Sequence, residues 1–217
     1  MIKKNITQFT IILLLLGITN AAWAIAAGFY LGSQFGTSNS NNKEAEVETG
    51  GTPSSELVTP TTKGFGARIY MGYQFSSYLG LEAAYVYIAN SIYKVNGNNN
   101  GNPEVHEGGV DVLGKLMLPI NKFNMDIFAK GGVAGMMRTQ SGRLASSNLN
   151  SDTFSKSTNV YAVPEVAIGA SYYLNQNWVA DITYNKLLSS SSFQSADLIT
   201  IGIAYHFVDT YCGQFLC

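Results

Sequence analysis

The chain has 217 residues, which is enough for one domain with a substantial core. Only 12% of its residues are charged, about half the share in an average soluble protein, and 12% are aromatic. The formal net charge of −1 excludes a strong electrostatic attraction to nucleic acid, so we expect no nucleic-acid partner.

Residues 1–24 have the three parts of a secretory signal peptide. Lys3 and Lys4 are the positive start, 9–18 is an apolar run too short for a stop-transfer helix, and Ala22-Trp23-Ala24 is a cleavage site of small residues. The alternatives are cleavage at 24–26 and a retained anchor helix. No later apolar run reaches the ~18 residues of a membrane-spanning helix. An exported chain this apolar must therefore bury its apolar side chains or expose them to lipid.

Residues 64–75 alternate between apolar side chains and small or polar ones, as in a β-strand with one apolar face. Phe65, Ile69 and Phe75 lie on the apolar face, whereas Gly66 and Arg68 lie on the other. The segment is longer than the usual soluble strand of about five or six residues. Its length suits a tilted strand that crosses a bilayer.

The same alternation recurs and predicts eight strands, with approximate bounds 27–36, 64–75, 79–90, 108–118, 125–138, 160–174, 178–187 and 197–207. Three connections are short, at 76–78, 120–123 and 175–177. The others are long and polar, and they include 37–63, the Asn- and Gly-rich 96–102, 139–157 and the serines of 189–192. Short periplasmic turns and long extracellular loops are typical of bacterial outer-membrane barrels.

The sequence therefore predicts an all-β fold, an eight-stranded antiparallel up-and-down transmembrane β-barrel in the cell outer membrane. The barrel would occupy residues 25–207, and 208–217 would form a short periplasmic tail. Outward aromatic residues fall near both ends of the strands, for example Phe75, Trp178 and Tyr205 at the short-turn end, as in the aromatic girdles of membrane proteins.

The positions of the charges argue against the strongest competitor, a soluble eight-stranded barrel of the lipocalin kind. The mid-strand charges all share a strand face with glycines: Arg68, Glu82, Asp111, Lys115, Asp126, Lys130, Glu165 and Asp181. Small residues mark the crowded concave side of a closed sheet, so these charges are expected in the lumen as a polar network. On the lipid face, an Arg or Lys at mid-depth would cost about 2–4 kcal/mol.

Several segments resemble the OmpA-type family of outer-membrane transmembrane barrels. They are 28–36 (GFYLGSQFG), 80–85 (GLEAAY), 114–120 (GKLMLPI), 126–132 (DIFAKGG) and the last strand, and the resemblance covers about 27–207. Nothing in the chain resembles the family's peptidoglycan-binding domain, so we expect the transmembrane domain only.

The resemblance implies a luminal network in which an acid on the third strand pairs with bases on neighbouring strands. Glu82, Lys115 and Lys130 match those positions, and a Glu82–Lys115 pair is compatible with the sequence. Asp181 stands where the family has an Arg, and Ser171 where an acid is usual. These two departures argue against a family-like gate.

Phe207 resembles the terminal aromatic residue that the outer-membrane insertion machinery recognises in this family as an assembly signal, although it could also be a simple girdle residue.

Cys212 and Cys217 could pair outside the cytoplasm, and so short a disulfide loop would stabilise only the tail. A metal site there is disfavoured because no other Cys and no nearby His completes a ligand set.

The sequence does not predict an enzyme. His106 is expected in the second long loop and His206 in the lumen near the periplasmic rim, at opposite ends of the barrel. Neither has a Ser and a carboxylate at a spacing suited to a triad. No phosphate-binding loop or metal cluster is present, so we expect no catalytic residue, no metal and no cofactor.

With eight strands the interior is filled by side chains, so we expect no open pore. The remaining function is a structural role in the envelope, with surface-exposed loops that contact a host or surface ligand in adhesion. Expected partners are outer-membrane lipid, lipopolysaccharide and the insertion machinery. The alternatives are a porin-like channel for small solutes and, less favoured, a lipid-modifying barrel enzyme.

Overall fold

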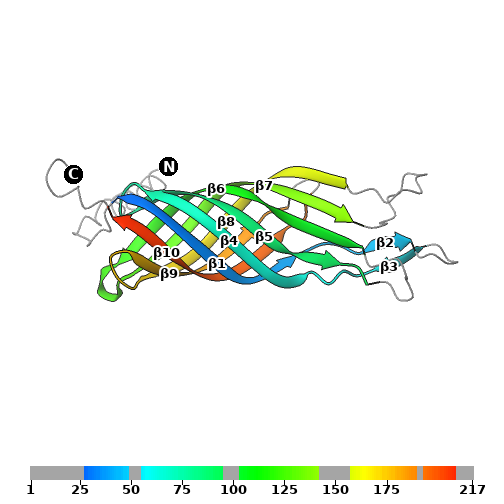
Figure 1. Ribbon diagram of the computed structural model, residues 1–217, viewed down its shortest axis with the longest axis horizontal. Helices are drawn as coiled ribbons and strands as arrows, with labels where there is room; N and C mark the ends of the chain where they lie inside the picture. The colour runs from blue at the N-terminus through cyan, green and yellow to red at the C-terminus, as the bar shows by residue number, and fades with distance from the viewer. Residues whose placement is uncertain (1–26, 49–54, 95–102, 142–156, 190–192, 209–217) are drawn as a thin grey trace, which may run out of the picture.

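The computed structural model describes residues 27–48, 55–94, 103–141, 157–189 and 193–208. Its main feature is a closed antiparallel barrel (Figure 1). The barrel strands are β1 (Gly28–Ser40), β4 (Lys63–Gln74), β5 (Leu79–Ile92), β6 (Glu104–Ile120), β7 (Met125–Ser141), β8 (Ser157–Tyr173), β9 (Trp178–Leu187) and β10 (Ala196–Val208). The predicted fold and all eight predicted strands are confirmed, and several strands extend further toward the long loops than predicted.

Each barrel strand pairs with its neighbours along the chain, and β1 closes the barrel by pairing with β10. The closing register runs from Gly28 opposite Val208 to Ser40 opposite Ala196. Closure gives every barrel strand two hydrogen-bonded neighbours, which matters because an unpaired backbone group in hydrocarbon costs several kcal/mol. The described residues include no helix that is both long and apolar enough to cross a membrane.

The short connections all lie at one end of the barrel, which we call the short-turn end. Between β4 and β5 the Ser76 hydroxyl accepts hydrogen bonds from the backbone N–H groups of Tyr78 and Leu79, at 3.2 Å each. Between β6 and β7 the 3-10 helix η1 (Asn121–Phe123) is followed by Asn124, which has a left-handed φ of 51°. Between β8 and β9 the Asn175 side chain caps the turn in the same way as Ser76.

The opposite end, the long-loop end, contains a hairpin that the sequence does not predict. The alternation pattern assigns 37–63 to one polar connection, but β1 continues to Ser40 and the connection then forms β2 (Ala45–Glu48) and β3 (Ser55–Val58). These strands form a separate two-stranded sheet beyond the ends of β1 and β5 (Figure 1). Both strands have only four residues, too few for an alternation pattern to stand out.

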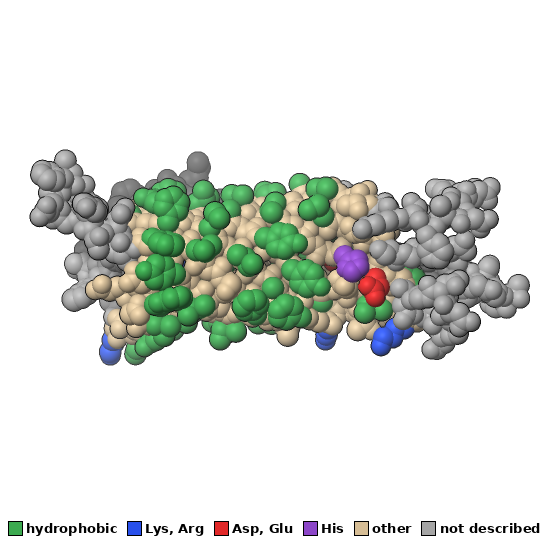
Figure 2. Space-filling model, viewed as in Figure 1, with side chains coloured by type: hydrophobic (Ala, Val, Ile, Leu, Met, Phe, Trp, Pro, Cys, Tyr) green, Lys and Arg blue, Asp and Glu red, His purple; other side chains and the backbone are tan. Residues whose placement is uncertain are grey.

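Apolar side chains cover the outer wall of the barrel (Figure 2). Ile69 is 57% exposed and Ile201 is 67% exposed, whereas Arg68 and Thr200, their neighbours in the chain, are buried. An exposed apolar wall around a buried polar interior is the reverse of a soluble barrel.

A row of aromatic side chains crosses the β1–β10 seam on the outside of the short-turn end. It consists of Trp178, Tyr205, Phe207, Phe29, Tyr73 and Phe75. Neighbouring rings meet edge to face, with centroids 4.8 Å apart for Phe29–Tyr73 and 5.0 Å apart for Tyr205–Phe207. Phe29 and Phe207 are register partners, so the row continues across the closing strand pair.

Candidate functional site in the barrel lumen

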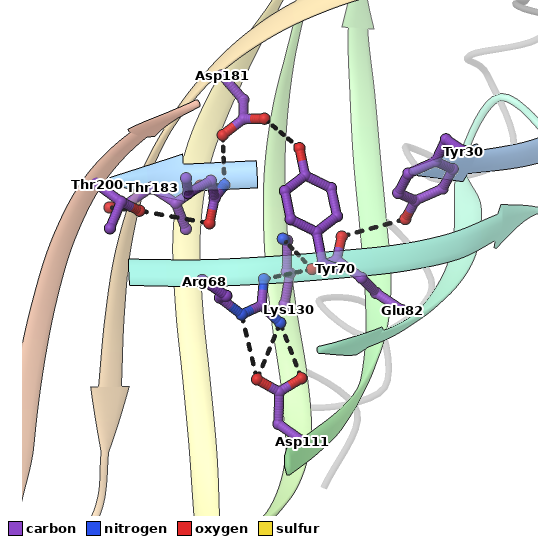
Figure 3. Close-up of polar contacts among 10 residues, drawn as sticks. Tyr30, Arg68, Tyr70, Glu82, Asp111, Lys130, Asp181, Thr183 and Thr200 are labelled. Atoms are coloured by element: carbon purple, nitrogen blue, oxygen red, sulfur yellow. Dashed lines mark hydrogen bonds and ion pairs between the residues drawn. The ribbon is translucent and has the colours of Figure 1, made fainter. Parts of the chain in front are cut away.

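The centre of the lumen is a buried cluster of two cations and two carboxylates (Figure 3). Arg68 on β4 binds Asp111 on β6 with two nitrogens, Nη2 to Oδ1 at 2.8 Å and Nε to Oδ2 at 3.1 Å. Its third nitrogen, Nη1, donates to Glu82 on β5. Lys130 on β7 donates from Nζ to the same Glu82 oxygen at 2.6 Å. The four side chains are fully or almost fully buried, and their formal charges cancel.

Two tyrosines enclose this cluster from the short-turn side. The Tyr30 hydroxyl donates to Glu82 Oε2 at 3.2 Å, and the Tyr70 hydroxyl donates to Asp181. Each ring lies over a glycine of the adjacent strand, Tyr30 over Gly72 and Tyr70 over Gly32. A Cβ at Gly72 would lie 2.2 Å from the Tyr30 ring, so the two glycines make room for the two rings.

Asp181 begins a second group of hydrogen bonds that joins β1, β9 and β10 (Figure 3). The Gln34 amide nitrogen donates to Asp181 and, at 3.0 Å, to the Thr183 hydroxyl. The Thr200 hydroxyl donates to the Gln34 amide oxygen at 3.4 Å. The charged cluster and this second group together place polar side chains across the middle of the lumen.

Lys115 does not form the ion pair with Glu82 that the family resemblance allows. Its Nζ lies over the rings of Phe128 and Tyr30, 4.5 and 5.4 Å from their centroids, in cation–π geometry. Lys115 stands opposite Gly80 on β5 and opposite Lys130 on β7, and of these two lysines it is Lys130 that bonds Glu82. Arg68 and Lys130 form the ion pairs with the Glu82 carboxylate instead.

The short-turn end of the lumen has a small polar cavity. Its volume is about 10 Å³, roughly the space that one water molecule needs, and its lining includes Lys115, Ser171, Asp181 and His206. The His206 ring is stacked on Tyr30 with a centroid separation of 4.9 Å.

On the long-loop side of these polar groups the lumen contains a cluster of apolar side chains. Its buried members are Val86, Ile88, Ala134, Met136, Val163, Leu187, Phe193, Ala196 and Leu198. Phe193 comes from the connection between β9 and β10 and is 1% exposed. We call this cluster the apolar layer. The sequence carried a signal for part of it, since Val86 and Ile88 share the inward face of β5 with Glu82.

A further polar group lies at the long-loop mouth. Arg138 approaches Glu107 with 3.6 Å between Nε and Oε1, and Asn42 donates to Ser91 at 2.8 Å and to Glu107 at 3.4 Å. His106 lies on β6 rather than in the second long loop where the sequence placed it, and it is exposed here, at the opposite end of the barrel from His206. In the part of the chain that the structure describes, no group of three or more His, Cys, Asp or Glu residues could hold a metal ion.

The eight charges singled out in the sequence all face the lumen, but they do not form one network. Arg68, Glu82, Asp111 and Lys130 form the central cluster, Asp181 belongs to the Gln34 group, and Lys115 is only half-buried.

The other two acids stand apart. Asp126 accepts a hydrogen bond from Tyr173, whereas both oxygens of buried Glu165 lack a hydrogen-bond partner. The alternation pattern also places Tyr30, Tyr70, Thr183 and Thr200 on the inward face, but their hydrogen bonds and those of Gln34 were not predicted, because such side chains are common on the inward face of any barrel strand.

The remaining predicted sites lie at or beyond the ends of the described chain. Phe207 is 54% exposed on the outer wall, where it belongs to the aromatic row. Residues 1–24, Cys212 and Cys217 lie outside the described residues.

Comparison with known proteins gives one family match and several relatives. The family model of the OmpA-like transmembrane domain matches residues 24–211. An uncharacterised protein of Coxiella burnetii is 26% identical over 214 residues, covering 83% of this chain and 86% of that protein. Outer membrane protein A of Serratia marcescens is 26% identical over 155 residues, covering 68% of this chain and 41% of that protein. The chain thus spans less than half the length of the Serratia protein.

Among solved structures, the outer membrane protein OprG of Pseudomonas aeruginosa superposes with a TM-score of 0.58. The sequence identity is 14%, and the match covers 84% of this chain and 97% of OprG. At this identity the likeness concerns the fold.

Proposed function

The chain belongs to the family of OmpA-like transmembrane domains, and on this premise we propose that it is a closed barrel with a structural role in the envelope and with loops that contact surface ligands. The protein is an outer-membrane β-barrel. In such barrels the short turns face the periplasm and the long loops face outward. The hairpin β2–β3 and the apolar layer are then at the extracellular end.

The filled lumen is the observation that carries this proposal. The charged cluster and the Gln34 group cross its middle, and the apolar layer packs on their extracellular side. An ion would have to pass a layer of tightly packed apolar side chains as well as a layer of ion pairs. This supports a barrel without an open pore, and it moves any binding function to the loops.

Planar-bilayer recording of the purified protein tests whether the barrel lacks an open pore. We expect no large, stable conductance. Porin-like channels of constant size would contradict the proposal and favour the alternative, a channel for small solutes.

The structure of the extracellular end supports the proposal that the loops contact a ligand. The hairpin β2–β3 lies beyond the barrel mouth, and its sequence is rich in acid, with Glu46, Glu48 and Glu56. Loops on a rigid scaffold carry binding residues more often than the scaffold does. We propose that these loops contact a host or surface ligand, while the apolar wall contacts outer-membrane lipid and lipopolysaccharide.

Deletion of the hairpin tests the role of the loops. Removing residues 45–58 spares β1 to Ser40 and Asn42, whose contacts with Ser91 hold the mouth together. We expect the shortened protein to keep its heat-modifiable gel mobility and to lose surface binding or adhesion. Deletion of 96–102, in the next loop, is the control for shortening a loop as such. Unchanged adhesion in both deletions would leave only the structural role in the envelope.

We further propose the following processing and assembly. Residues 1–24 are removed as a signal peptide, 25–207 form the barrel, and 208–217 remain in the periplasm. The insertion machinery recognises Phe207 as an assembly signal. This role is supported by its position near the end of β10, the strand that closes the barrel against β1. We propose no enzymatic activity, in agreement with the separation of His106 and His206.

A further inference from the structure

Glu165 differs from every other buried carboxylate of the described lumen. Its side chain is 1% exposed, and neither Oε1 nor Oε2 has a hydrogen-bond partner. The ion pairs of the described residues do not include it. An ionised carboxylate buried in this way is so unfavourable that such groups are normally paired, bound to a metal ion or neutralised.

The other carboxylates show how the lumen normally treats an acid. Glu82 and Asp111 share the guanidinium of Arg68. The remaining acids have donors as well: Asp126 has Tyr173, Asp181 has Gln34 and Tyr70, and Glu107 has Asn42. Arg68 and Lys130 are the nearby cations, and both are already bound to Glu82. The formal charges of the central cluster cancel without Glu165, so its charge is left over.

A second side chain without partners lies beside Glu165. Asn185 on β9 is fully buried, and its amide oxygen and nitrogen both lack a hydrogen-bond partner. In the β8–β9 register Glu165 stands opposite Leu187 and Ala167 opposite Asn185, so Glu165 and Asn185 are diagonal neighbours on the inward face. Diagonal neighbours have Cα atoms roughly 7–8 Å apart, so polar atoms of both side chains can contact the same small ligand.

We propose that Glu165 and Asn185 bind a small monovalent cation of the size of Na⁺ or K⁺. The two carboxylate oxygens and the amide oxygen are hard oxygen ligands of the kind that such ions prefer. A single carboxylate balances one positive charge, and a divalent ion would require further acidic ligands. The cation neutralises Glu165 at the boundary between the charged cluster and the apolar layer, where Leu187 and Leu198 exclude bulk water.

A water molecule alone would not serve the same purpose. Water could donate hydrogen bonds to Glu165 and satisfy Asn185, but it would leave the negative charge uncompensated. The charge of Glu165 is therefore neutralised either by a bound cation or by a proton. A bound cation makes the melting temperature depend on the kind of salt, whereas a proton does not.

The test uses the full chain folded in detergent micelles, with the apparent melting temperature read from heat-modifiable gel mobility. The melting temperature is measured in NaCl, KCl and choline chloride at equal ionic strength, so that electrostatic screening is the same and only the size of the cation differs. We expect a saturable rise of a few degrees with Na⁺ or K⁺ relative to choline, because a ligand that binds only the folded state stabilises it. Equal melting temperatures in the three salts would overturn the proposal in favour of a protonated Glu165.

Two variants assign the effect to this site. Glu165→Gln removes the charge while keeping the shape, and it should abolish the difference between the salts. Glu107→Gln is the matched control, because it removes a buried carboxylate that has Arg138 and Asn42 as partners, and it should keep the difference. A salt response that persists in Glu165→Gln would overturn the assignment.

A variant that keeps the carboxylate and a direct observation complete the test. Asn185→Leu should raise several-fold the Na⁺ or K⁺ concentration needed for half of the rise, and an unchanged concentration would count against Asn185 as a ligand. Crystals grown with Tl⁺ in place of K⁺ should give an anomalous peak next to the Glu165 carboxylate. Absence of that peak, in crystals that contain Tl⁺, would overturn the proposal even if Glu165→Gln failed to fold.

Discussion

At Arg68, three nitrogen atoms of one fully buried side chain bind two carboxylates. Removing one partner of a buried ion pair typically costs about 3–5 kcal/mol, because the other charge remains buried and uncompensated. We predict that Arg68→Met lowers the free energy of unfolding by about this amount, as measured by urea titration of the folded, heat-modifiable form. Lys122→Met, at an exposed position, is the control for loss of a cation.

The double variant Arg68→Met, Asp111→Asn separates the charge from the packing. It removes the carboxylate that the single variant leaves without a donor, so part of the lost stability should return. Equal losses in the single and double variants would mean that Arg68 acts through packing rather than through charge.

Gly72 shows how closely the luminal tyrosines fit the opposite wall. A Cβ there would lie 2.2 Å from the Tyr30 ring, so Gly72→Ala must displace Tyr30 from Glu82. Overpacking of this kind costs about 1–3 kcal/mol. Gly131→Ala is the matched control, because a Cβ at Gly131 would meet no atom within 4 Å.

The same titrations report on this prediction. Gly72→Ala should lower the urea midpoint, Gly131→Ala should leave it unchanged or raise it slightly, and Tyr30→Leu in the Gly72→Ala background should recover part of the loss. A Gly72→Ala protein as stable as the Gly131→Ala protein would contradict the close contact.

At the scale of elements, the barrel strands could be predicted and the structures at the long-loop mouth could not. Alternation over ten or more residues indicates both a strand and its inward face, which is why Arg68 and Glu165 could be placed in the lumen from the sequence. The partners of those charges depend on the stagger between strands, which alternation does not contain. Lys115 and Lys130 are the example, because both are compatible with Glu82 in the sequence and are register partners, yet only Lys130 bonds Glu82.

Phe193 belongs to an element whose conformation depends on contacts distant in the sequence. The preceding serines suggest a solvated loop, yet Phe193 packs into the apolar layer near Tyr161, with ring centroids 6.2 Å apart. No local pattern distinguishes such an anchor from an exposed loop aromatic.

We predict that Phe193→Ala lowers the free energy of unfolding by about 3–5 kcal/mol, the usual cost of emptying the space of a buried Phe. Phe65→Ala removes a ring that is 56% exposed on the outer wall and should cost clearly less. Thermal transitions of both variants, followed by gel mobility, make the comparison. Equal losses would show that Phe193 does not anchor the connection between β9 and β10.

At the scale of the whole molecule, the barrel inverts the arrangement of a soluble protein. The core combines ion pairs, tyrosines and amides with buried apolar side chains, which include the apolar layer toward the extracellular end, while the apolar outer wall faces lipid. Pairing of β1 with β10 closes the barrel and gives the backbone groups at the last two strand edges hydrogen-bond partners. The same pairing brings Phe29 next to Phe207 in the aromatic row on the outer wall.

The outward direction of the apolar wall can be tested with a single charge. Ile201 lies midway along β10 and is 67% exposed, so Ile201→Arg would place a cation against the acyl chains. We predict a loss of about 2–4 kcal/mol in the free energy of unfolding from lipid bilayers, measured by urea titration. Leu174→Arg, in the short turn after β8, should cost about 0–1 kcal/mol because the membrane surface is close to that end. If both arginines were tolerated equally, the wall around Ile201 would not face hydrocarbon.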